Sequence, residues 1–206
     1  MSVMDIYKEI YARISHYDIE DIVNDFRAHN LDINYQDEKG ISPLMLAAFC
    51  GLFDPVECFL KEGAKLDLVD QEGNSALHHS VLPYDSGSSP SSITVELLLK
   101  AGANCEAKNN KGLTPLAIAT ATLLGGRYEE DSPESVHALI LAGSNTEVSF
   151  DGKRSILDAL IDFHHEHPEF FEYCLSFKAF LKAAAEKREL LSSTPHQYKS
   201  YSSSRL

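Results

Sequence analysis

Positive charge is scarce in this chain. It has 18 Lys and Arg residues against 31 Asp and Glu residues, which gives a formal net charge of −13 at pH 7. Proteins that bind nucleic acids rely on Lys and Arg to neutralise backbone phosphates, so we expect no nucleic-acid partner. The excess of acid has two explanations that the sequence leaves open: plain solubility, or attraction of a basic protein partner.

Long apolar runs are also absent. No run approaches the roughly 20 residues that a membrane-spanning helix needs, and residues 1–5 lack the basic start and apolar core of a signal peptide. We therefore expect no membrane partner and no signal peptide. The cysteines show no paired or metal-binding spacing, which predicts reduced thiols in a cytoplasmic protein. They are Cys50, Cys58, Cys105 and Cys174.

Motifs for catalysis are missing as well. Gly125-Gly126 is not a phosphate-binding loop, because no Lys-Ser/Thr follows it, and no Ser, Cys or Asp lies in a recognisable nucleophile setting. His164 and His167 would share a helix face and could hold a metal only with a third ligand from elsewhere. A polar surface turn before Pro168 is the simpler interpretation. We expect no enzyme activity, no cofactor, no metal and no small-molecule substrate.

What the chain does have is a phrase that recurs at the head of similar segments. The glycines of this phrase, at positions 40, 73, 112 and 152, are separated by 33, 39 and 40 residues. The unit is therefore 33 residues, with about six or seven inserted in each of the next two copies. A fixed-period repeat predicts a stacked solenoid that offers a long surface to a partner. The copies begin at Asp37, Asp70, Asn109 and, in degraded form, Asp151.

Each unit carries the signals of two helices. Ser42 and Thr114 stand where a helix N-cap is favoured, and a proline follows each at the first helical position. The glycine of the recurring phrase supplies a left-handed residue for the turn at the tip of a hairpin-like finger. Each second helix is expected to end at a glycine. These glycines are Gly63, Gly102 and Gly143.

These features resemble the ankyrin repeat, whose unit opens with turn-Gly-x-Thr-Pro-Leu-His-x-Ala-Ala and closes with Leu-Leu-x-x-Gly-Ala. Good copies of the opening are residues 37–48 and 109–117, and residues 98–103 copy the close. The resemblance implies an all-α ankyrin-repeat solenoid of stacked helix-turn-helix units, with short hairpin-like fingers and helical caps at both ends. It also predicts that His78, at the family's histidine position, bonds backbone between units, while His79 faces out or packs. Met45, Ala117 and Asp158 replace that histidine elsewhere.

The resemblance makes residues 1–191 a single ankyrin-repeat domain. We expect an N-terminal cap at 1–36, repeats at 37–69, 70–108 and 109–148, and a degenerate repeat with a C-terminal helical cap at 149–191. Asn30 takes the position of a C′ glycine and is expected to be left-handed. Residues 192–206 are rich in serine and lose periodicity, which predicts a disordered tail.

The resemblance implies a non-catalytic protein-protein interaction module that binds another protein on its concave and finger surface. We expect Ile41, Phe49 and Leu82 to anchor that partner. Charged side chains at the finger tips, Glu38, Glu72 and Lys111, would tune specificity. The alternative is that the three apolar side chains pack against their own neighbouring finger or an insertion. The full set of expected contact residues is Glu38, Lys39, Ile41, Phe49, Cys50, Gln71, Glu72, Asn74, Leu82, Asn110, Lys111 and Leu113, with Ala121 and Thr122 at the corresponding helix positions of the third repeat.

The insertions and the chain end leave further alternatives open. The insertions, residues 83–90 and 124–133, are either functional loops on one face or tolerated extensions, since lengthening a loop costs little. Residues 204–206 match a short pattern that adds as a strand to PDZ domains. The charged run 186–189 and the polar end after it resemble export signals of bacterial effectors. The alternative function is therefore a secreted effector that binds a host protein in the host-cell cytosol.

Overall fold

The computed structural model describes residue 26 and residues 28–82, 91–125, 132–149, 153–168 and 175–193. In these ranges the chain forms helices and loops, with one isolated antiparallel bridge between Ser149 and Ser155. The structure therefore confirms an all-α fold. The described helices are α3 (Pro43–Phe49), α4 (Phe53–Lys61), α5 (Ala76–His79), α6 (Ser92–Lys100), α7 (Pro115–Leu124), α8 (Ser132–Leu141), α9 (Ile156–Glu166) and α10 (Leu175–Ser193).

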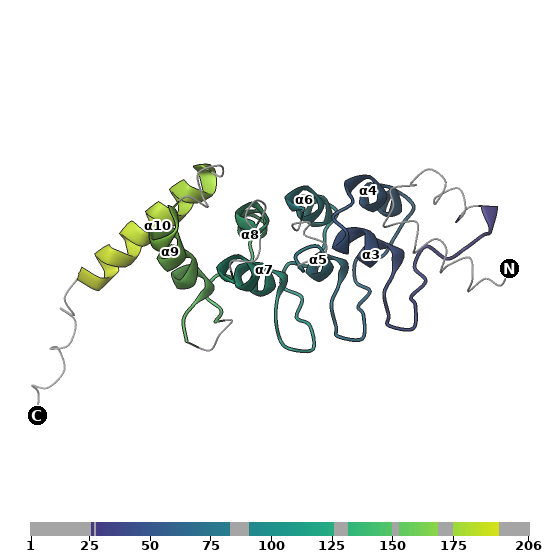
Figure 1. The fold of residues 1–206 in the computed structure, drawn as a ribbon, viewed down its shortest axis with the longest axis horizontal. Helices are drawn as coiled ribbons and strands as arrows, with labels where there is room; N and C mark the ends of the chain where they lie inside the picture. The colour runs from purple at the N-terminus through teal and green to yellow at the C-terminus, as the bar shows by residue number, and fades with distance from the viewer. Residues whose placement is uncertain are drawn as a thin grey trace, which may run out of the picture.

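The helices stack as a row of pairs (Figure 1). The pairs are α3 with α4, α5 with α6, α7 with α8, and α9 with α10. Successive pairs meet through α3, α5, α7 and α9 in an inner layer, and α4, α6 and α8 form an outer layer. A finger projects before each of α3, α5 and α7, on the same side of the stack (Figure 1). This is the solenoid that the repeats predict.

The helix ends follow the predicted signals. Ser42 Oγ and Thr114 Oγ1 each accept a hydrogen bond of 3.2 Å from a backbone N–H three residues later, which satisfies a donor that the helix start leaves unpaired. Asn30 is left-handed as expected, with φ of +50°. The glycines after the outer helices are left-handed too, with φ of +85°, +94° and +93° at Gly63, Gly102 and Gly143.

Equivalent positions of successive units build one continuous core. Burying a large apolar side chain fully stabilises the folded state by about 1.5–3 kcal/mol relative to leaving it exposed. Each unit therefore adds a similar set of stabilising contacts. The outer layer contributes the buried side chains Val56, Phe59, Val95, Leu98, Val136 and Leu139, and the inner layer contributes Leu44, Leu77 and Leu116.

The second inner helix is much shorter than its neighbours. α5 has 4 residues, whereas α3 has 7 and α7 has 10. Ala76 replaces the proline that starts the other two helices, and the hydroxyl of Ser80 donates to the carbonyl of Leu77 at 2.9 Å. Such side-chain bonds to the preceding turn compete with helix hydrogen bonding.

α10 covers the far end of the stack. Phe177 and Leu181 are buried, and Phe180 and Ala184 pack against the core, as the amphipathic pattern predicts. The helix continues to Ser193, past the start of the tail expected at 192. Residues 194–206 of that tail lie outside the described residues, as do residues 1–25 of the expected N-terminal cap.

The histidine cluster lies at the end of α9. The sequence places it in a surface turn before Pro168, but His164 belongs to the last turn of the helix and His167 is its C-cap. Burial lowers the pKa of His164, and the nearby charges of His165 and Lys178 lower it further. Among the described residues, no group of three or more His, Cys, Asp or Glu side chains is arranged to hold a metal ion.

Candidate functional site

One side chain shapes each finger tip. In the first finger, Asp37 Oδ1 accepts the N–H groups of Lys39 and Ile41, both at 2.8 Å. Asp70 repeats this in the second finger at 2.9 and 2.7 Å, and Asn109 in the third at 3.0 Å for both bonds. A side-chain oxygen that binds N–H groups further along stabilises a tight turn. The three fingers therefore share one rigid tip geometry.

Neighbouring fingers are clamped together at their tips. The N–H of Gln71 donates to the carbonyl of Lys39 at 3.0 Å, and its side-chain amide donates to the carbonyl of Glu38 at 2.7 Å. Asn110 does the same one unit later, donating to the carbonyls of Glu72 at 2.9 Å and Gln71 at 2.8 Å. The side chains of Gln71 and Asn110, which were expected to contact a partner, thus hold the fingers in register.

His78 joins the second inner helix to the third finger. Its Nε2 lies 3.1 Å from the carbonyl oxygen of Leu113, and its Nδ1 lies 3.2 Å from the backbone N of Ser75. A carbonyl only accepts and an N–H only donates, so Nε2 carries the proton and the ring is neutral. Burial is the main cause of the lowered pKa of His78. The predicted bond of His78 to backbone of another unit is confirmed.

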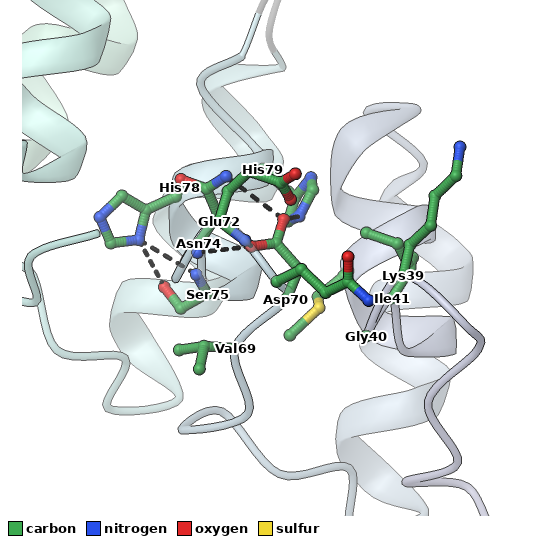
Figure 2. A network of polar contacts seen from close by, with 12 residues as sticks. Lys39, Gly40, Ile41, Val69, Asp70, Glu72, Asn74, Ser75, His78 and His79 are labelled. Atoms are coloured by element: carbon green, nitrogen blue, oxygen red, sulfur yellow. Dashed lines mark hydrogen bonds and ion pairs between the residues drawn. The ribbon is translucent and has the colours of Figure 1, made fainter. Parts of the chain in front are cut away.

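His79 makes a buried pair with Asp70. Its Nε2 lies 2.8 Å from Asp70 Oδ2, and the two side chains are 10% and 2% exposed. Burial lowers the pKa of His79 and outweighs the opposing attraction of the Asp70 carboxylate. Figure 2 shows Asp70 between Asn74 and His79, with the ring of His78 directed to the other side. This pair was not predicted from the sequence. The hint in the sequence is that a histidine stands at position 79, where the adjacent repeats have the apolar residues Leu46 and Ile118.

The Asp70–His79 pair is connected to the third finger through two amides. Asn74 Nδ2 donates to Asp70 Oδ2 at 3.2 Å, and Asn109 Nδ2 donates to Asn74 Oδ1 at 2.9 Å. Asn109 in turn shapes the tip of the third finger. The second and third fingers are therefore linked from within as well as at their tips.

A hollow of about 450 Å³ lies between these two fingers and α7. Its apolar lining comes from both repeats, with Leu82 from the second, and Leu113, Ile118 and Ala121 from the third. The polar amides in its wall are already bonded to each other, while the exposed side chains of Glu72 and Lys111 reach its rim. The complete lining is Glu72, Asn74, Leu82, Asn109, Lys111, Leu113, Ile118, Ala121, Thr122 and Gly125.

The other expected contact residues lie away from this hollow. Phe49 packs edge-on against His79, with ring centroids 6.1 Å apart, and Ile41 packs against the core. Both are half-buried. Cys50 is also half-buried, and burial raises the pKa of its thiol. Glu38 is exposed on the first finger.

The outer layer presents a different surface. Lys61 pairs with Glu57 at 2.9 Å on α4, and Lys100 pairs with Glu96 at 3.0 Å on α6. Exposed pairs of this kind are typical of a solvated helix face. The insertion at 83–90 and residues 126–131 of the other one lie outside the described residues. None of the described helices is long and apolar enough to cross a membrane.

A family model for the ankyrin repeat matches residues 39–71 and 72–110. The chain is 35% identical over 102 residues to a putative ankyrin repeat protein of fowlpox virus, a match that covers 47% of this chain and 27% of that protein. It is 33% identical over 81 residues to Rabankyrin-5 of Mus musculus, covering 39% of this chain and 6% of that protein.

The chain is also 32% identical over 105 residues to a probable serine/threonine-protein kinase of Dictyostelium discoideum, covering 50% of this chain and 12% of the kinase. The chain thus spans about a quarter or less of the length of these relatives.

Proposed function

Because the chain belongs to the ankyrin-repeat family, whose repeats generally mediate protein-protein interaction, we propose that it is a non-catalytic module that binds a partner protein at the hollow between its second and third fingers. A cytoplasmic setting is part of the proposal, and it agrees with Cys50, Cys58 and Cys105 being in no disulfide bond.

The hollow itself is the observation that carries this proposal. Leu82 and Leu113 supply apolar surface, and the wall amides of Asn74 and Asn109 are satisfied by each other, so a partner gains apolar contact without leaving them unpaired. The tip clamp of Asn110 holds these two fingers together before binding. A preformed site loses little conformational entropy on binding.

The geometry changes which apolar residues we propose as anchors. Leu82 lines the hollow and remains an anchor, and Leu113 joins it. Phe49 is occupied by its contact with His79, and Ile41 by the core. Both side chains are thus engaged within the chain, and Phe49 contacts the inner helix α5 rather than the finger or insertion that the sequence leaves open as its alternative.

A bulky side chain placed in the hollow tests the proposal. Ala121 is exposed and lines the hollow, so Ala121→Trp fills the space from an exposed position. Ala183 is also an exposed helical alanine, and it belongs to α10, which lies at the other end of the stack from the fingers (Figure 1), so Ala183→Trp is the matched control. Circular dichroism and urea unfolding would verify that both variants keep the fold.

The readout is affinity capture from a eukaryotic cytosolic extract, followed by mass spectrometry. We expect a partner that wild type and Ala183→Trp retain and that Ala121→Trp loses. A partner held equally well by Ala121→Trp would place binding elsewhere and overturn the proposal.

A further inference from the structure

One position of the finger tip alternates in charge along the stack. Lys39, Glu72 and Lys111 occupy the same place in three successive fingers, two residues after the Asp or Asn that shapes each tip. All three side chains are exposed. Among the described ion pairs, none involves any of the three. They therefore form a row of positive, negative and positive charge that is available to a partner.

In the neighbouring column of the tips, Glu38 is exposed on the first finger, but the side chains of the second and third fingers are not available in this way. Gln71 and Asn110, which precede Glu72 and Lys111, use their amides to clamp adjacent fingers. The Lys39–Glu72–Lys111 row is thus exposed at all three tips, and two of its members, Glu72 and Lys111, also line the hollow.

The spacing of this row limits what fits it. Packed helices lie about 8–10 Å apart, so the fingers they carry follow at a similar interval. An extended chain in the polyproline II conformation advances about 3.1 Å per residue with three residues per turn, so it covers that interval in roughly three residues and presents every third side chain on the same face. A helix, about 10–12 Å across, is as wide as the interval. It would rest on the tips and leave the hollow empty, whereas an extended segment directs a side chain into it.

The hollow determines where along the partner segment an apolar side chain must lie. Glu72 and Lys111 both reach its rim, while Lys39 does not. An apolar group that contacts Leu82 and Leu113 must therefore lie between the groups that face Glu72 and Lys111.

Resting on the proposed function, we propose that the occupant is an extended protein segment in a polyproline II-like conformation, with an acidic, a basic and an acidic side chain at intervals of about three residues. An apolar side chain lies between the basic residue and the acidic residue that faces Lys111. The acidic side chains pair with Lys39 and Lys111, and the basic one with Glu72. Alternating charge of this kind fixes register and rejects segments of the wrong sign, more than it adds affinity.

Selection from a random library of displayed 12-residue peptides tests this directly, since it assumes no chain direction. Three proteins are used: wild type, Ala121→Trp to identify peptides that depend on the hollow, and a sign-reversed variant with Lys39→Glu, Glu72→Lys and Lys111→Glu. The reversed residues are exposed, so the variant is expected to fold.

We expect hollow-dependent peptides of wild type to carry the acidic–basic–acidic pattern, and those of the reversed variant to carry its inverse. Each peptide should bind its own protein about tenfold more tightly than the other, because several exposed ion pairs change sign together. Hollow-dependent peptides whose charges are the same for both proteins, or are spaced by seven residues as on a helix, would overturn the inference.

A library without hollow-dependent peptides would also overturn it. The proposed function fails separately, when an intact partner is captured equally by wild type and Ala121→Trp.

Discussion

The carboxylate of Asp70 lies 2.8 Å from the Nε2 of His79 and is almost wholly buried, at 2% side-chain exposure. The same carboxylate accepts two N–H groups of its own finger and the side-chain amide of Asn74. One buried group thus connects the tip of the second finger, the second inner helix and, through Asn74, the third finger. In the first finger, Asp37 makes only the turn bonds among those described.

Replacing Asp70 should therefore cost more stability than replacing Asp37. We expect Asp70→Ala to lower the free energy of unfolding by about 3 kcal/mol, because it removes the turn bonds and leaves buried donors of His79 and Asn74 unpaired. Asp37→Ala should cost about 1 kcal/mol, the value of the turn bonds alone. Urea unfolding of both variants measures the difference, and equal losses would show that the Asp70–His79 pair adds nothing to stability.

Stability should fall as the solution becomes mildly acidic. The pKa values of His78 and His79 are lowered in the folded protein, chiefly by burial. Below the unfolded value of about 6.5, the unfolded chain takes up protons that the folded chain does not. Each histidine then lowers the free energy of unfolding by up to about 1.4 kcal/mol per pH unit until its folded pKa is reached.

Urea titrations at a series of pH values from 7.5 to 5 measure this slope. His79→Leu, which installs the residue found at the equivalent position of the first repeat, should reduce the slope. A profile that is flat between pH 7.5 and 5 in the wild type would contradict the prediction.

The parts of the fold that the sequence predicts are those that depend on near neighbours. The turn glycines, the capping hydroxyls of Ser42 and Thr114 and the C′ glycines act within one or two turns of chain, so they can be read without a partner. The role of His78 was predictable because the family resemblance supplied its long-range contact.

The Asp70–His79 pair and the hollow were not predictable in this way. The pair depends on how α5 turns toward its own finger. His79 marks a difference from the adjacent repeats, but nothing local tells a turn aspartate that is buried from one that is exposed. The hollow depends on Ala121 being small where two units meet. Phe49 was expected on the binding surface because its position suggests exposure, but its ring packs against His79.

A buried hydroxyl on α7 offers a way to stabilise the protein. Thr120 has 0% exposure, and its Oγ1 finds no hydrogen-bond partner among the described residues. Val81 occupies the equivalent place in the second repeat and is also fully buried, which shows that this site accepts valine. Thr120→Val should raise the free energy of unfolding by about 1 kcal/mol, because it removes an unsatisfied polar group at constant volume.

Thr122→Val, on the same helix, is the control for that substitution. The hydroxyl of Thr122 donates to the carbonyl of Ile118 at 3.0 Å and is only half-buried, so its loss should not stabilise the protein. Thermal and urea unfolding compare the stabilities of the two variants. An equal increase in the free energy of unfolding for both would mean that valine packing, and not removal of the unpaired hydroxyl, causes the stabilisation.

The absence of a side chain at Gly73 lets the second and third fingers approach each other closely, so replacing this glycine should separate them. A Cβ at Gly73 would lie 2.6 Å from Asn110 Oδ1 and 2.8 Å from Asn110 N, and φ there is +79°. Gly112 has a similar φ of +75° but nothing within 4 Å of such a Cβ. Gly112→Ala should therefore lower the free energy of unfolding by about 1 kcal/mol for backbone strain alone. Gly73→Ala should lower it by about 3 kcal/mol because the tip clamp is also broken.

Hydrogen exchange at the N–H of Asn110 should accelerate in Gly73→Ala and not in Gly112→Ala. Unchanged exchange in both variants would mean that the fingers are held in register by the buried Asn74–Asn109 bond rather than by their tips.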